Sequence, residues 1–163
     1  MSTPTVAGSV RELLDLLSGI ARLDGDRLAM EDEGAFRGGG IRDLAWSATF
    51  SEDPVTVEAA RWIIWEASQS LGSPSASIHE LYMARGRGEV SGFTVPAVNL
   101  RAQVFDMAAA MCRAAQAIDS GTIVFELARS EQEYTFQRPG EYITSVLAGC
   151  ISASWQGPVF VQG

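Results

Sequence analysis

The stretch Gly92-Phe-Thr-Val-Pro-Ala-Val-Asn99, with the similar run Thr122-Ile-Val-Phe-Glu-Leu127 downstream of it, decides the fold of this chain. Both are apolar runs with a polar side chain at or near their end, Asn99 in the first and Glu126 in the second. A third apolar run covers Pro158–Gln162. Strands that alternate with helical patterns predict right-handed crossovers and a parallel sheet. Near-continuous apolar strands further predict a sheet covered on both faces.

Two helices are expected between these strands. The first covers Ala102–Ile118, where apolar residues recur at helical spacing. The second begins at Pro139, because proline is favoured in the first turn of a helix. In parallel α/β folds, functional groups sit at the carboxyl ends of the strands. The polar residues expected together at that edge are Asn99, Glu126, Arg129, Ser130 and Gln162.

The N-terminal part of the chain has mostly helical patterns. Ser9-Val-Arg-Glu12 fits a capping box, and the wide apolar face that follows predicts a helix past Arg22, ended by Asp24-Gly-Asp26. Asp53-Pro54 predicts a second helix start, and Gly72 its end. These patterns therefore predict that the N-terminal part is a helical unit.

Several segments of this part allow more than one interpretation. Gly38-Gly-Gly40 can cradle a phosphate only between a strand and a helix, so a linker or turn is favoured. Leu44–Phe50 fits either a short strand or a helix. Trp62 and Trp65 would mark a binding site if exposed, but packing in the core or between domains is the favoured interpretation.

A domain boundary is predicted at Ser73-Pro-Ser75, which has the composition of a short linker. It divides the chain into 1–75, a helical extension, and 76–163, with strands at about 92–99, 121–127 and 158–162. Ser77–Glu80 fits a second capping box that opens a short helix, Ile78–Arg85. The only histidine, His79, lies in its first turn, where a solvated residue is favoured over a catalytic base or ligand.

Composition excludes several functions. The net charge of −8 argues against a nucleic-acid surface. All twelve basic residues are arginine, so these residues supply neither a Schiff-base lysine nor a P-loop. One histidine and two cysteines cannot build a zinc cluster, and Cys112 and Cys150 are expected to be buried, reduced thiols. The N-terminus has no secretory pattern and no apolar run reaches about 18 residues, so we expect a cytoplasmic protein without a membrane span.

The first strand, Gly92–Asn99, resembles the G-F-x-x-P-A-x-N strand that opens the barrel of class II, zinc-dependent fructose- and tagatose-bisphosphate aldolases. Ile78–Arg85 resembles the helix that caps the bottom of that barrel, and Thr122–Glu126 its second strand. Glu131–Pro139 resembles the following loop of tagatose-type relatives. The resemblance covers about residues 76–163 and implies the first three β/α units of a TIM barrel, behind a mostly helical extension.

The resemblance also implies site residues. Asn99 would lie near the substrate and Glu126 near the metal site. Family members often carry a serine where this chain has Ala128, so either Ser130 binds substrate instead or the substrate differs. The structural alternatives are a helix-capping turn for Asn99 and, for Glu126, an ion pair with Arg129 or another barrel residue. The family's zinc acts as a Lewis acid on the ketose carbonyl and stabilises the enediolate.

The resemblance places an Asp-His pair, with the first metal ligand, directly after the third strand. It is therefore expected beyond Gly163, in a longer, homo-oligomeric enzyme of carbohydrate metabolism and glycolysis that cleaves a sugar phosphate. We expect this chain to contain no catalytic or metal-ligating residue, to bind no zinc and to be inactive by itself. The alternative is a non-catalytic aldolase-like partner or stabilising subunit. An unrelated small α/β enzyme would need a catalytic constellation, which these residues do not supply.

Overall fold

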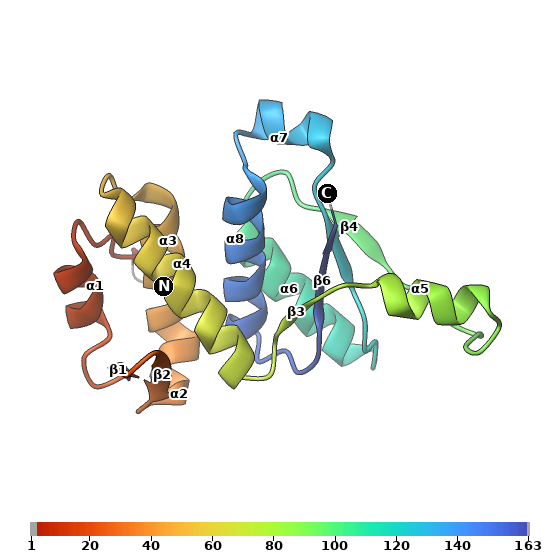
Figure 1. Cartoon of the computed structure of the whole chain (residues 1–163), viewed down its shortest axis with the longest axis horizontal. Helices are drawn as coiled ribbons and strands as arrows, with labels where there is room; N and C mark the ends of the chain where they lie inside the picture. Colours follow the sequence, from red (N-terminus) through yellow and green to blue (C-terminus); the bar gives the residue numbers. More distant parts are fainter. Residues whose placement is uncertain (1–2, 163) are drawn as a thin grey trace.

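A four-stranded parallel sheet forms the C-terminal half of the chain in the computed structural model, which describes residues 3–162 (Figure 1). Its strand order is β3-β6-β5-β4. The strands are β3 (Ser75–Ala76), β4 (Ala97–Asn99), β5 (Val124–Glu126) and β6 (Val159–Gln162). The predicted α/β class and parallel pairing are therefore confirmed, although the three expected strands are shorter than predicted.

The first expected strand, Gly92–Asn99, is sheet only from Ala97 onward. Gly92 has a φ of +84°, outside the strand region, and Pro96 has no N–H to donate. The Pro96 carbonyl still accepts a hydrogen bond from the Val124 N–H at 2.9 Å. The residues before it are held instead by Arg85, which donates to the Phe93 carbonyl at 2.7 Å and lies over the Phe93 ring. This contact, rather than the sheet, fixes the segment.

Helices α6 (Val104–Ala117) and α8 (Pro139–Ser152) cover one face of the sheet (Figure 1). The row formed by Val98, Phe125 and Val161 packs against the core on this side. On the other side, α5 (His79–Gly86) projects away from the body, and all eight of its residues are at least partly exposed. Helical cover is therefore confirmed for one face, while Val124 and Phe160, which alternate to the other face, are also buried.

Helices α6 and α8 approach each other closely at Gly149. A Cβ atom at this position would lie 2.5 Å from the Phe105 carbonyl oxygen and 2.9 Å from the Ala108 Cβ. A Cβ atom at these distances would clash with its neighbours, so only glycine fits between the two helix backbones. Residue 149 thus sets how closely α8 packs on α6.

The N-terminal part contains more than helices. Its elements are α1 (Val10–Leu16), β1 (Ala21–Asp24), β2 (Arg27–Met30), α2 (Glu33–Ala35), the π-helix η1 (Phe36–Gly40), α3 (Ile41–Phe50) and α4 (Pro54–Ser70). The start predicted for α4 is confirmed, because the Asp53 carboxylate accepts from the Val55 and Thr56 N–H groups. Its predicted end is also confirmed, since Gly72 has a φ of +83°.

The prediction of a first helix past Arg22 is wrong. Ser9 accepts from the Glu12 N–H as expected, and Glu12 bonds back to the Gly8 N–H, but the helix ends at Leu16. Gly19, with a φ of +73°, turns the chain into an antiparallel hairpin of β1 and β2. Asp24 pairs with Arg27, so Gly25-Asp26 is the hairpin turn rather than a helix stop.

The glycine triplet Gly38-Gly-Gly40 is not a linker. It belongs to η1, one turn of π-helix between α2 and α3, so helical structure continues from Glu33 to Phe50. Phe36 and Ile41, on either side of the triplet, are fully buried, and this burial holds the segment in a helix despite its glycines. The same continuity settles Leu44–Phe50 as helix.

Helices α3 and α4 pack on α8, so residues from both predicted domains share one core. Arg37 connects the layers by donating to the Ile151 carbonyl at 2.7 Å and to the Leu71 carbonyl at 3.3 Å. The expected linker is also fixed, because Ser73 is buried and donates to the Trp155 carbonyl at 2.7 Å. Ser75 pairs in the sheet. The division of the chain into two domains at residue 75 stays a prediction.

The surface of the helical layer carries two large aromatic side chains. Trp62 is 38% exposed and Trp65 is 48% exposed, so the prediction that they pack in the core or between domains is wrong. Both lie on the side of α4 opposite its buried residues Ala60, Ile64 and Ala67. His79 is exposed, as expected. Within residues 3–162, no helix combines the length and apolar character needed to cross a membrane.

Substitution of Gly149 by alanine should destabilise the chain. The added methyl group forces α8 away from the Phe105 carbonyl, which should lower the free energy of unfolding by about 1–3 kcal/mol. Gly140 in the same helix is the control, since an added Cβ there meets open space. Gly140→Ala should leave stability unchanged or raise it by up to ~1 kcal/mol. Urea denaturation measures both, and equal effects would contradict the close helix contact.

Candidate functional site

Each of the three longer strands, β4, β5 and β6, ends in a polar residue, and these three residues lie side by side. Asn99 pairs in register with Glu126, and Glu126 pairs with Gln162. The prediction that these three residues meet at one edge is therefore confirmed. Because side chains alternate along a strand, they point away from the face covered by α6 and α8. Asn99 and Gln162 are exposed, and Glu126 is half-buried.

A buried carboxylate lies at the edge of this row. Glu131, on the short helix α7 (Arg129–Thr135), has a side chain that is only 8% exposed. One carboxylate oxygen accepts from the Asn99 amide at 2.7 Å and from the Ala128 N–H at 3.0 Å. The other accepts from two Arg101 nitrogens, at 2.7 and 2.6 Å, with the Tyr134 hydroxyl at 3.5 Å. Glu131 thus links β4, the segment after it, and α7.

These partners keep Glu131 ionised. The hydrogen bond from the Ala128 N–H, then those from Arg101 and Asn99, lower the pKa of the Glu131 carboxyl, while burial raises it by less. The same pairing raises the pKa of the Arg101 guanidinium, chiefly through its hydrogen bond to Glu131. The site therefore contains a fixed ion pair that orients the Asn99 amide.

The structure bears on the structural alternatives for Asn99 and Glu126. The Asn99 amide bonds to Glu131 and not to the start of α6, so the helix-capping alternative is wrong. The ion pairs found among residues 3–162 do not include one between Glu126 and Arg129. The Glu126 backbone carbonyl accepts from the Tyr142 hydroxyl at 2.7 Å. Burial is the main cause that raises the pKa of Tyr142 to about 12, so this phenol stays a donor.

Ser130 is exposed on α7, directly before Glu131 in the chain. The segment Glu131–Pro139 was expected to be a loop, but α7 continues as a helix to Thr135. Phe136 then turns the chain with a φ of +55° and is 90% exposed. The helix forms because Glu131 caps its own N-terminus through the Ala128 N–H.

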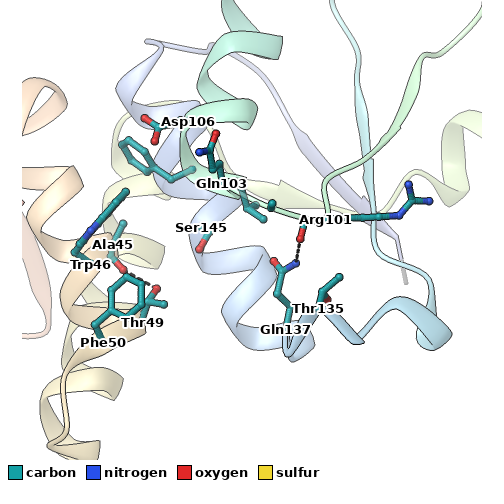
Figure 2. A pocket seen from close by; sticks show the side chains of 13 residues that line it. Ala45, Trp46, Thr49, Phe50, Arg101, Gln103, Asp106, Thr135, Gln137 and Ser145 are labelled. Carbon is teal, nitrogen blue, oxygen red and sulfur yellow. Dashed lines mark hydrogen bonds between the residues drawn. The ribbon is translucent and has the colours of Figure 1, made fainter. Parts of the chain in front are cut away.

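A groove of about 510 Å³ lies next to this cluster, between α3 and the segment that leads into α6 (Figure 2). Trp46, Phe50 and Phe105 form its aromatic wall. Arg101 lines the groove with its backbone, while its side chain points away (Figure 2). The Gln137 amide donates to the Arg101 carbonyl at 3.3 Å. The sequence offered no sign of this groove, because its walls come from both predicted domains.

Zinc, which the family resemblance implies, does not fit the residues of this site. The strand-end row offers two amides and one carboxylate, whereas zinc prefers three or four histidine, cysteine or carboxylate ligands. His79 lies on the projecting helix α5. Within residues 3–162, no group of three or more such side chains is placed to hold a metal ion. The arrangement is suited instead to hydrogen bonding with the hydroxyl or carbonyl groups of a polar ligand.

The residues that sequence reasoning missed are Glu131 and Arg101. Glu131 was included only in an expected loop, and Arg101 lies in the turn after the first strand. A carboxylate at the third position of a short helix, three residues after Ala128, is a capping pattern that would have identified the helix. The bonds to Asn99 and Arg101 depend on tertiary structure alone. Comparison with known proteins finds no matching family model, no similar curated protein and no similar solved structure.

Replacement of Glu131 by glutamine should lower the melting temperature at neutral pH. It should also reduce the fall in melting temperature as the pH is lowered. The pKa of Glu131 in the folded chain is lower than the ordinary value of a glutamate carboxyl, so ionisation of this group stabilises the fold above that ordinary value. This stabilisation is lost as the pH falls through the folded-state pKa. Thermal melts between pH 7 and 3 measure the difference between wild type and Glu131→Gln.

The matched control is Glu133→Gln, which removes an exposed carboxylate from the same helix. This variant should follow the wild-type pH profile. Identical profiles for Glu131→Gln and Glu133→Gln would contradict the role of Glu131 as the centre of the cluster.

Proposed function

We propose that this chain provides the first three β/α units of a class II ketose-bisphosphate aldolase, with β4, β5 and β6 as the first strands of a TIM barrel. The in-register row of Asn99, Glu126 and Gln162 carries this proposal. The row points away from α6 and α8, as side chains do that face the interior of a barrel surrounded by helices. Its position at the carboxyl ends of the strands is where barrel enzymes place their active sites.

In this proposal the residues of the chain bind and orient a sugar phosphate. Asn99 and Ser130 contact the substrate, and Glu126 lies near the metal site. The amides and the carboxylate suit sugar hydroxyls, and Glu131 holds the Asn99 amide in one orientation. The reaction is reversible carbon–carbon cleavage of a ketose bisphosphate, in glycolysis or related carbohydrate metabolism in the cytoplasm, within a homo-oligomer. The metal ligands belong to polypeptide other than residues 3–162.

One feature favours a second candidate, a non-catalytic aldolase-like partner or stabilising subunit. β3 pairs with Val159 and Phe160 at the edge of β6, where a fourth barrel strand would have to pair. A following strand would therefore need to displace β3 or pair only beyond Phe160. Because the N-terminal layer also gives this chain a core of its own, it has features of an independent folding unit.

Complementation in trans separates the two candidates. The chain is co-expressed with a class II aldolase that lacks its first three barrel strands, and separately with an intact one. Cleavage of fructose 1,6-bisphosphate and tagatose 1,6-bisphosphate is then measured by coupled oxidation of NADH. The chain alone should bind no stoichiometric zinc and cleave neither sugar, whereas the truncated aldolase should become active in its presence. Asn99→Ala should lower that activity at least roughly tenfold, because an oriented donor is lost.

The control variant is Gln69→Ala, which removes an exposed amide from α4 and should leave the complemented activity unchanged. Association with the intact aldolase, without rescue of the truncated one, would favour the partner subunit. Association with neither would contradict both candidates. Stoichiometric zinc in the purified chain would contradict the assignment of the metal ligands to other polypeptide.

A further inference from the structure

The two cysteines of the chain are in contact at the interface between α6 and α8. The Sγ atoms of Cys112 and Cys150 are 3.3 Å apart, and both residues are fully buried. They are 38 positions apart in the sequence, so only the packing of the two helices brings them together. The predicted buried thiols are confirmed, but their contact was not foreseen. Neither thiol belongs to the candidate site.

The close approach of the helices holds the two sulfur atoms together. Cys150 follows Gly149, the residue at which the α8 backbone touches α6, and Cys112 lies one helical turn after Ala108 in the same contact. A disulfide bond requires sulfur atoms about 2.05 Å apart. Bond formation therefore has to shorten the existing contact by about 1.2 Å.

We propose that Cys112 and Cys150 form a reversible disulfide that joins α6 to α8 when the chain reacts with a low-molecular-weight disulfide such as glutathione disulfide. One cysteine thiolate attacks the glutathione disulfide, forming a mixed disulfide and releasing one glutathione. The other cysteine thiolate then attacks the protein sulfur of this mixed disulfide and releases the second glutathione. The cysteine pair loses two electrons and two protons, and the glutathione disulfide gains them.

Burial makes this reaction slow in the closed structure. The hydrogen bond with Cys112, and then desolvation, raise the pKa of the Cys150 thiol, so little reactive thiolate is present. The oxidant also has no access to side chains that are fully buried. Oxidation therefore proceeds from conformations in which α6 and α8 open locally, and it should accelerate in mild denaturant.

The bond would close the loop that contains β5 and α7, and with them Glu126 and Glu131. A cross-link across such a loop stabilises a fold mainly by restricting the unfolded chain. Oxidation would therefore raise the free energy of unfolding, because the unfolded chain loses conformational freedom. This inference does not depend on the proposed aldolase relationship.

The test uses the intact 163-residue chain, equilibrated in glutathione buffers of increasing oxidation and quenched in acid. We expect conversion to a monomer that is about 2 mass units lighter, from the loss of two hydrogens. Peptide mapping should show a Cys112–Cys150 bond. The melting temperature should rise by on the order of 5–10 °C and return to its original value after reduction with dithiothreitol.

The matched controls are Cys112→Ala and Cys150→Ala, each of which should give a free thiol or a glutathione adduct with no rise in melting temperature. The comparison of reduced and oxidised wild type does not depend on whether these variants fold. Wild type that keeps two free thiols in the most oxidising buffer, with and without mild denaturant, would overturn the proposal. Adducts or intermolecular dimers alone would also overturn it, as would a bond that leaves the melting temperature unchanged.

Discussion

The structure depends on the burial of α8 between two layers. This helix packs on α6 on one side and on α3 and α4 on the other, and eight of its residues are buried. The approach to α6 is possible because residue 149 has no side chain, so the two backbones come into contact. Arg37 fixes the other side, since its guanidinium bonds the carbonyl of Ile151 at the end of α8. One helix therefore joins the N-terminal layer to the sheet.

The same arrangement positions the polar edge of the sheet. Helices α6 and α8 take up one face, so the side chains that end β4, β5 and β6 on the other face stay accessible. Glu131 adds order to this edge, because a buried carboxylate is stable only with several donors and finds them on Asn99, Arg101 and Ala128. The chain thus presents a row of two amides and one carboxylate, in which Glu131 orients the Asn99 amide, and this row suits recognition of a polar ligand.

Prediction from the sequence succeeded where the pattern was local and failed where distant segments met. The starts of α4 and α8 follow from proline in the first turn, and the alternation of strands and helices gave the parallel sheet. The first helix is shorter than predicted, because Leu17 and Ile20 continue the helical spacing beyond Leu16, where the helix ends. The triplet Gly38–Gly40 predicts a linker or turn, but burial of Phe36 and Ile41 outweighs the low helix propensity of glycine and keeps the segment helical.

The sequence by itself determined the α/β class, the parallel strands and the meeting of Asn99, Glu126 and Gln162 at one edge. These features follow from periodicity and from the rule that parallel strands share their carboxyl ends. Only the tertiary structure decided that β3 pairs at the edge of β6, that Glu131 and Arg101 hold Asn99, and that Cys112 meets Cys150. Those contacts join residues that are distant in sequence, so no local pattern encodes them. They follow from how closely the helices pack around α8.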